Sequence, residues 1–350
     1  MGLSVSQLSG LVSTTLSNLG RGKITDIAAD LQEYVAMDKL LTQNNVKFEG
    51  GESIKFNLTS TLGSNARDVG LYQVDNVDVD DSHIQGEVPW RFTECSYAFD
   101  RREKQLNSPK MERIVDLIKL RRAREIGGLA DHMETRFWGK PATSADTTTA
   151  FGIPYWVVKT SGNTTYANAG FNGGDPSGFS SGAAGLATAT YDNWKNFAAN
   201  YVTVSKNDLI KRMRKAHRLT DFKSPIKHPS YDMGGIARKF QIYVNDATIN
   251  TMEDVGEAQN ENLGRDLDSM GGTMAFRKNP IIYIPFLDAD SSNPVYMINY
   301  GVFKCVMLEG EWMRETVQVA PNQHNVVQVF TDLSWNTVCY DRRKQAVLSV

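Results

Sequence analysis

An acidic stretch of β-like sequence that runs directly into a long basic helix is the feature that most limits how this chain can fold. Residues 46–92 alternate apolar and polar side chains in short runs separated by turn residues, as β-strands do. Their apolar residues are too sparse to form a separate core, so we expect a projecting arm that needs a partner surface. The aspartates of this stretch are Asp68, Asp75, Asp78, Asp80 and Asp81.

The long helix is predicted over residues 108–138. Ser108 and Pro109 are typical of an N-cap and a first helical position, and apolar side chains recur at spacings of three and four from Met111 to Phe137. At about 1.5 Å per residue the helix would be about 45 Å long, which suits a strut. We predict that the acidic stretch of one subunit docks on basic residues of a neighbouring copy, with pairing inside one chain as the open alternative. The expected basic partners are Arg101, Arg102, Arg113, Arg121 and Arg124.

The remainder of the chain separates helices from strands. Residues 23–43 and 205–218 have helical periodicity, and a strand over 240–245 precedes a helix over 246–262. The last seventy residues are β-rich, with apolar or alternating runs at 281–287, 295–308, 313–319, 326–333, 335–340 and 345–350. This segregation predicts an α+β fold. Residues 161–190 are rich in Gly, Ser, Thr, Ala and Asn and are expected to form a surface insertion or long loop.

The helix over 205–218 has one strongly basic face. Its members are Lys211, Arg214, Lys215 and Arg218. This face is a candidate for contact with DNA phosphates, and a solvated helix face is the equal alternative. No aromatic platform accompanies it in the sequence, so recognition of particular bases or of single strands is not expected.

Composition excludes several classes of protein. The 350 residues, with a formal net charge of −2, argue against a dedicated nucleic-acid binder, and no apolar run approaches the length of a membrane span. The sequence does not begin like a secretory signal. Cys95, Cys305 and Cys339 are far apart, without the spacing of a zinc site, and are expected to be small buried residues in a reducing compartment.

Motifs that carry chemistry are missing. There is no phosphate-binding loop, dinucleotide fingerprint, HExxH or GxSxG, and the five histidines are scattered. The three aspartates at 78, 80 and 81 lack the full calcium-loop pattern. We therefore expect no catalysis, no metal and no cofactor. A β-rich hydrolase using carboxylates around Glu309 or Asp288 stays as the alternative from another class.

The order of these parts resembles the major capsid protein of tailed bacteriophages, with the Hong Kong 97-type fold. The stretches that carry the resemblance are 33–58, 97–138, 240–265 and 294–350. The resemblance implies an N-terminal arm over 1–47, an extended E-loop over 48–99, and a P domain over 100–219 that includes the spine helix 108–138 and the loop insertion 161–190. It further implies an A domain over 220–300 and P-domain return strands over 301–350.

The function implied by the resemblance is structural. Copies of the chain would assemble into pentamers and hexamers of an icosahedral shell that encloses double-stranded DNA, in the host cytoplasm and then in the virion. A separate scaffolding protein is expected because the arm begins almost at the first residue, together with a portal and, in some shells, a cement protein. The DNA would be held without sequence specificity, and no membrane is involved. An encapsulin-like shell around an enzyme cargo has the same fold and remains open.

Overall fold

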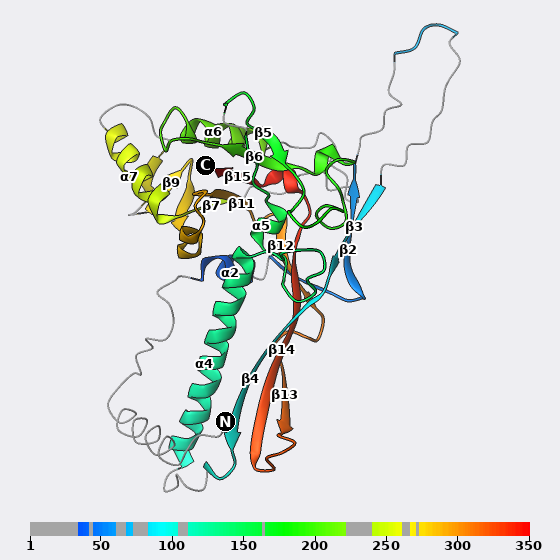
Figure 1. Ribbon diagram of the computed structural model, residues 1–350, viewed down its shortest axis with the longest axis vertical. Helices are drawn as coiled ribbons and strands as arrows, with labels where there is room; N and C mark the ends of the chain where they lie inside the picture. Colours follow the sequence, from blue (N-terminus) through cyan, green and yellow to red (C-terminus); the bar gives the residue numbers. More distant parts are fainter. Residues whose placement is uncertain are drawn as a thin grey trace.

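The computed structural model describes residues 34–41, 45–60, 68–72, 83–103, 111–162, 165–221, 240–260, 267–270 and 273–350 (Figure 1). A head built around an eight-stranded sheet lies above a long leg, and a hairpin projects to one side. The leg contains α4 (Met111–Trp138) beside the long strands β4 (Arg91–Asp100), β13 (Arg314–Val319) and β14 (Val326–Cys339). The hairpin consists of β2 (Ser53–Thr59) and β3 (His83–Pro89).

The leg sheet has five strands in the order β1-β12-β14-β13, with β4 also paired to β14. β1 (Val46–Glu49) runs parallel to β12 (Phe303–Leu308), and β14 pairs with β4 over ten positions, from Val326 opposite Asp100 to Trp335 opposite Arg91. The first half of β14 alternates between buried and half-buried residues, whereas residues 333–339 are all buried. Only the upper half of this strand therefore passes through the interior of the body.

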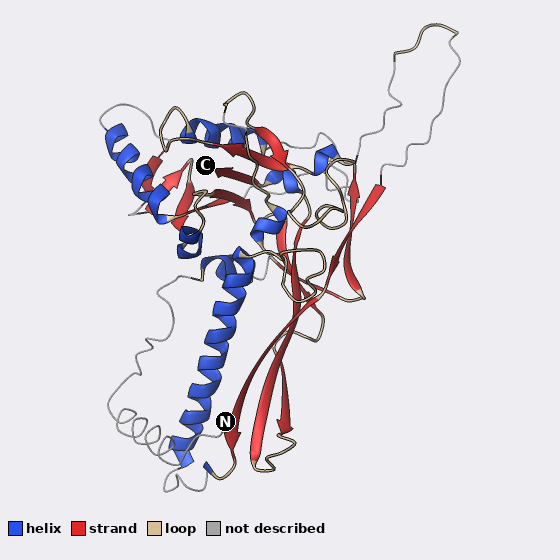
Figure 2. Cartoon of the chain, viewed as in Figure 1, coloured by secondary structure: helices blue, strands red, loops and turns tan. Residues whose placement is uncertain are grey.

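The head sheet has the strand order β5-β6-β15-β11-β7-β10-β9-β8. Its strands are β5 (Gly170–Gly173), β6 (Asn196–Asn200), β7 (Phe240–Val244), β8 (Leu267–Met270), β9 (Thr273–Phe276), β10 (Asn279–Tyr283), β11 (Val295–Asn299) and β15 (Ala346–Ser349). The sheet is mixed, because β6 with β15 and β7 with β10 are parallel pairs. Figure 2 shows the helices gathered around these strands.

Both faces of the head sheet are covered, which explains its continuous apolar strands. In β11, Val295 and Met297 belong to the core beneath α6 (Leu209–Leu219) and α7 (Asp246–Asn260), whereas Tyr296 and Ile298 belong to the core shared with the end of α4. Shorter helices complete the body. They are α2 (Val35–Leu40), α5 (Ile153–Trp156), and the 3-10 helices η1 (Asp192–Trp194), η2 (Pro285–Ala289) and η3 (Arg342–Lys344).

The predicted α+β class and most predicted elements are confirmed. The long helix, the strand β7, the helix α7 and the β-rich end all occur where their patterns place them, although the predicted strands 326–333 and 335–340 form one strand, β14. The start of the long helix at Ser108 lies outside the described residues. Cys305 and Cys339 are buried as expected, and Cys95 is half-buried. No helix in the described ranges is long and apolar enough to cross a membrane.

Strand pairing differs from the predicted division of the chain in three places. Residues 46–49 and 91–100 pair with leg strands, so the projecting arm is the hairpin 53–89 and not the whole of 48–99. β5, β6 and α6, expected in the P domain, belong to the head. The final strand β15, expected to return to the P domain, lies between β6 and β11 of the head sheet. These strands pair with partners far away in the chain, and local sequence patterns do not predict such pairings.

The predicted surface insertion at 161–190 is irregular, but it is not confined to the surface. Phe179, Ala183 and Leu186 are buried, and the Phe179 ring meets Tyr155 edge-on at 4.9 Å. The fully buried Arg342 donates to the carbonyl oxygen of Gly174 at 2.8 Å, and also to those of Trp156 and Trp194. Because a buried guanidinium needs acceptors, these bonds tie the irregular segment to the body.

Candidate assembly surfaces

The hairpin β2–β3 forms an arm whose base is fixed to the body. The Phe56 ring lies directly over Gly86, where a Cβ atom would come within 2.6 Å of Phe56 Cζ, so glycine is required for this approach. The same ring meets Tyr340 edge-on at 5.5 Å and lies 6.3 Å from Trp194. The N–H of Glu87 donates to the carbonyl oxygen of Ala184 at 3.1 Å. These contacts fix the orientation of the base of the arm relative to the body.

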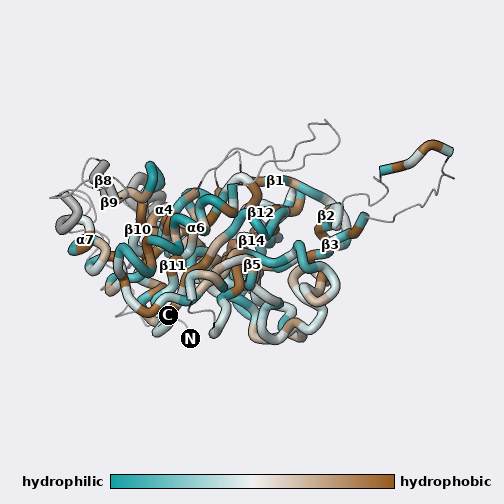
Figure 3. The backbone as a smooth tube through the Cα atoms, turned by 90° about the horizontal axis from the view of Figure 1, so that it is seen from above, coloured by the Kyte–Doolittle hydropathy of each residue, from teal (hydrophilic) through white to brown (hydrophobic). Residues whose placement is uncertain are grey.

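The far end of the arm is apolar as well as acidic. Seen from above in Figure 3, its described tip, residues 68–72, lies well outside the body. Leu71 and Tyr72 are 92% and 101% exposed, and Val69 is 59% exposed. Asp68 is exposed beside them, and the other four aspartates predicted to dock lie outside the described residues. The apolar tip was not identified as a surface from the sequence, because Val69 and Leu71 also fit the alternation of a half-buried strand.

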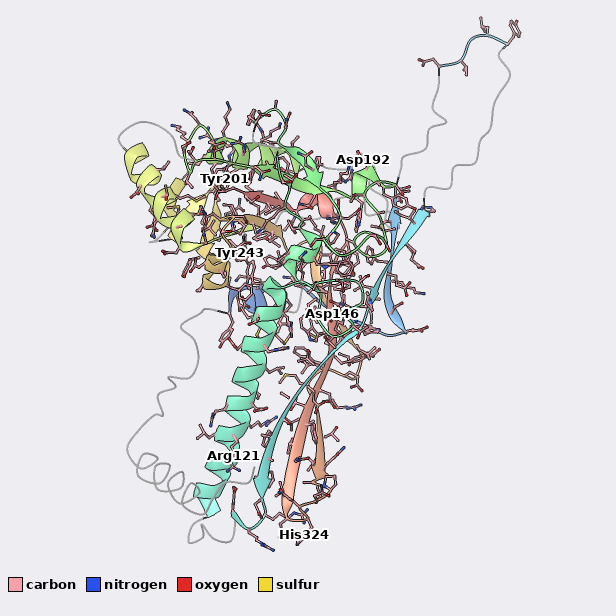
Figure 4. All side chains as sticks on the ribbon, in the orientation of Figure 1. Arg121, Asp146, Asp192, Tyr201, Tyr243 and His324 are labelled. Atoms are coloured by element: carbon pink, nitrogen blue, oxygen red, sulfur yellow. The ribbon has the colours of Figure 1, made fainter. Side chains whose placement is uncertain are left out.

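The predicted basic partner Arg121 is engaged within its own chain (Figure 4). Its guanidinium lies 3.0 Å from the Glu103 carboxylate and donates to the carbonyl oxygen of Ala98 at 3.1 Å, and its side chain is only 17% exposed. Arg121 therefore has an acidic partner in its own chain, although Glu103 is not one of the arm aspartates predicted to dock.

Three of the other four predicted basic partners are exposed, unlike Arg121. Arg101, Arg102 and Arg124 are exposed, and the Arg113 side chain lies outside the described part of the helix. The exposed three remain predictions for contact with a neighbouring copy. The neighbouring Arg122, which the prediction did not include, pairs with Glu315 of β13 in the same chain.

The basic face of α6 surrounds an aromatic ring that the sequence analysis did not anticipate. Lys211 Nζ and Lys215 Nζ lie 4.6 and 4.9 Å from the centre of the Tyr166 ring, and Arg218 donates to the Tyr166 hydroxyl at 3.2 Å. Lys215 also donates to the carbonyl oxygens of Tyr166 and Ala167. The sequence did not reveal this ring, because Tyr166 comes from a loop more than forty residues away in the chain. Its contacts with Lys211 and Lys215 give it a structural role beside the helix and leave the prediction of no base recognition untested.

Electrostatics in this region are dominated by positive charge. Burial and the nearby guanidinium groups of Arg277 and Arg218 lower the pKa of Arg214. Lys211 and Arg218 are exposed, while Arg214 and Lys215 are half-buried. The geometry is that of a cationic surface held in place by Tyr166, which can contact an anionic polymer without reading its sequence.

The carboxylates proposed for a hydrolase lie at surface turns. Glu309 is exposed, Glu311 pairs with Arg314, and Asp288 accepts hydrogen bonds from the Tyr283 hydroxyl at 2.5 Å and from the N–H of Asp246 at 2.9 Å. Within the described ranges, no group of three or more His, Cys, Asp or Glu residues could hold a metal ion. Asp288 and Glu311 are thus engaged in hydrogen bonds or ion pairs with neighbouring elements of the structure.

The comparisons with known proteins concern the fold. No protein-family model matches the sequence, and no curated protein matches it either. Among solved structures, the cyanophage A-1(L) capsid asymmetric unit matches with a TM-score of 0.62 and 13% identity, covering 94% of this chain and 95% of that one. The chain has the capsid fold. The predicted Hong Kong 97-type architecture is thereby confirmed.

Two further structures extend the comparison. The mature capsid of bacteriophage PhiM1 matches with a TM-score of 0.51 and 10% identity, over 94% of this chain and 90% of that one. The holo-SrpI encapsulin complex from Synechococcus elongatus PCC 7942 matches with a TM-score of 0.50 and 10% identity, over 100% and 96% of the two chains. The capsid fold of this chain is thus shared with both phage heads and an encapsulin.

Proposed function

We propose that this chain is the major capsid protein of a tailed phage, which assembles into pentamers and hexamers of an icosahedral shell around double-stranded DNA. The observation that carries the proposal is the anchored arm with its exposed apolar tip, on a chain whose fold matches capsid proteins along nearly its whole length. Large apolar side chains exposed at the end of an arm with an anchored base are suited to a partner surface. A second copy of the chain is the partner that a shell supplies.

Two interactions would contribute to docking, the burial of the apolar tip and ion pairs made by the acidic residues, and burial is the stronger. Burying Leu71 and Tyr72 would each contribute roughly 2 kcal/mol, whereas an exposed ion pair contributes only about 0–1 kcal/mol. We therefore assign most of the docking energy to the tip, and the choice of register to the acidic residues Asp68, Asp75, Asp78, Asp80 and Asp81. Arg101, Arg102 and Arg124 are the proposed basic partners on the neighbour.

Other partners follow from the shell role. We propose that the basic face of α6 contacts DNA phosphates inside the shell, a role supported by the exposed Lys211 and Arg218. A separate scaffolding protein and a portal would take part in assembly in the host cytoplasm, and a cement protein is an optional addition to the virion. No catalytic step is part of this role.

A cargo shell of the encapsulin type is the second candidate, favoured by the match with the SrpI encapsulin over the whole of this chain. Both candidates predict closed particles, and they differ in their contents. A phage head needs scaffold and packages DNA, whereas a cargo shell forms without scaffold and encloses a protein.

Electron microscopy of the expressed protein tests the proposal. We expect uniform polyhedral particles, formed alone or with the scaffolding protein. Reversing the charges of Asp78, Asp80 and Asp81 together should lower the yield of particles, and L71A with Y72A should lower it further, with unchanged circular dichroism. A protein that stays monomeric at high concentration, with and without scaffold, would exclude both kinds of shell. Unchanged yield in the tip variant would exclude the docking role of the tip.

A further inference from the structure

Glu134 is a nearly buried carboxylate near the end of α4, where it is 5% exposed. Its Oε2 accepts the backbone N–H of Met37 at 2.8 Å, and its Oε1 accepts that of Ala36 at 3.2 Å. Oε1 also accepts the indole N–H of Trp138 at 2.7 Å. Both oxygens are thus used, by donors from two different elements.

The first two donors belong to the first turn of α2. The N–H groups of a first turn have no acceptor within their own helix, and the N-cap residue usually provides one. Here the N-cap residue Tyr34 makes no side-chain capping bond. Glu134 therefore supplies the cap from a helix almost one hundred residues further along the chain. A helix of six residues is too short to be stable alone, so α2 depends on such contacts.

The third donor connects this cap to the head sheet. The Trp138 ring meets Tyr243 edge-on at 5.1 Å and lies 6.2 Å from Tyr296. Tyr243 in turn shares a hydrogen bond of 2.7 Å with the hydroxyl of Tyr300. Burial raises the pKa of Glu134, although its hydrogen bonds oppose the shift. A carboxylate in such a place is retained only where several donors satisfy it.

We propose that Glu134 is a positioning residue for the start of the chain, fixing α2 at the junction between α4 and the head sheet. It thereby fixes the position of α2 relative to α4 and the head sheet. The part of the inference that concerns assembly rests on the proposed shell function, because a subunit packs into a shell only if its elements keep fixed relative positions.

Hydrogen exchange of the full chain tests the proposal. In E134Q, which keeps the shape but replaces one acceptor oxygen with a donor, exchange of the amides at 35–41 should be about tenfold faster or more. E134A should show the same effect. D131N, an exposed carboxylate on the same helix, is the matched control and should exchange like wild type. The indole N–H resonance of Trp138 should shift in E134Q and stay in place in D131N. Particle yield should fall in both Glu134 variants only.

Different results would contradict the cap, the positioning of α2 or the role in assembly. Exchange at 35–41 that stays at the wild-type rate would exclude the cap. Exchange that rises equally in β7 would show that Glu134 supports the whole core without positioning α2. Normal particles from a variant with fast exchange at 35–41 would exclude a role in assembly. If wild type itself forms no particles, the shell function fails, and the exchange data still decide whether Glu134 positions α2.

Discussion

Two segments of α4 are held to the molecule by different forces. In the last turns, Met133, Phe137 and Trp138 are buried in the core between the leg and the head. In the segment 121–125, the contacts are charged: Arg121 pairs with Glu103, Arg122 with Glu315, and Glu125 accepts the N–H of Ser96 at 3.0 Å. Apolar burial contributes a few kcal/mol per side chain, while exposed ion pairs contribute less and weaken with salt.

The difference shows that the two segments of this long helix are attached to the rest of the molecule with different strengths. Its upper end is fixed to the body by burial, and its middle is attached by contacts that break and re-form at little cost. We infer that apolar burial sets the orientation of the head on the helix, whereas the charged contacts to the leg sheet contribute less to it. Four substitutions test this comparison, and they are ordered by the size of the effect we expect.

The largest effect is expected at Phe137. This ring is fully buried and meets Trp335 of β14 edge-on at 5.1 Å. Phe137→Ala should lower the free energy of unfolding by about 3–5 kcal/mol, because it removes a buried ring and leaves a cavity. Chemical denaturation followed by circular dichroism measures the change. A loss below about 1 kcal/mol would contradict the claim that burial fixes this end of the helix.

Phe137 also shows what sequence patterns can and cannot predict. Its place in an apolar stripe predicts that it is buried, and the same reasoning recovers α4, β7 and most strands of the last seventy residues. The pattern does not say that its partner is Trp335, almost two hundred residues away in the chain. The same limit explains why Tyr166 beside Lys211 and β15 in the head were missed. These contacts depend on tertiary packing between segments that are distant in the sequence.

The candidate site residues were predicted less well than the fold. Charge alone does not distinguish Arg121, which has an acidic partner in its own chain, from Arg124, which is exposed. Both follow the same helical spacing, and the difference arises because Glu103 lies beside only one of them. The exposed tip at Leu71 was hidden for a related reason, since apolar alternation indicates burial unless the position of the strand is known.

The second effect is expected at Arg121. Its ion pair with Glu103 is mostly shielded from solvent, with side-chain exposures of 17% and 14%. Arg121→Ala should cost about 1–2 kcal/mol, because it leaves the Glu103 carboxylate without its partner. The matched control is Arg124→Ala at the exposed position one turn away, which should cost less than about 0.5 kcal/mol. Equal costs for the two variants would remove the distinction between paired and free arginines on this helix.

The third effect concerns pH at the buried end of the helix. Burial raises the pKa of Glu134 above its ordinary value of 4.5. At a pH between 4.5 and the raised pKa, the folded protein therefore keeps a proton on Glu134 that the unfolded protein has lost. Unfolding then releases a proton, and stability falls as the pH rises through this window. The carboxyl of Asp131 and the hydroxyls of Tyr243 and Tyr300 also face Glu134, but the pKa values of both tyrosines are raised by burial, so neither titrates there.

Glu134→Gln removes this proton. As the pH rises above 4.5, the free energy of unfolding of E134Q should therefore increase relative to that of wild type, which means that E134Q becomes relatively more stable. Below pH 4.5 the difference should be constant. Denaturant titrations at several pH values measure the difference, with Asp254→Asn, an exposed carboxylate on α7, as the control. Parallel pH profiles for E134Q and wild type would show that the Glu134 carboxyl keeps its ordinary pKa in the folded protein.

The smallest effect is expected at Arg122, whose pair with Glu315 joins α4 to the edge strand β13 at the surface. The two side chains are 54% and 38% exposed, so solvent screens their attraction. Arg122→Ala should cost about 0.2–1 kcal/mol at low ionic strength, and this cost should disappear in about 1 M salt, where the screening length is about 3 Å. The cost of Phe137→Ala should persist in the same salt, because it does not depend on charge. A salt-independent cost at Arg122 would mean that its aliphatic stem, packed on β13, and not its charge, attaches the middle of the helix to the leg sheet.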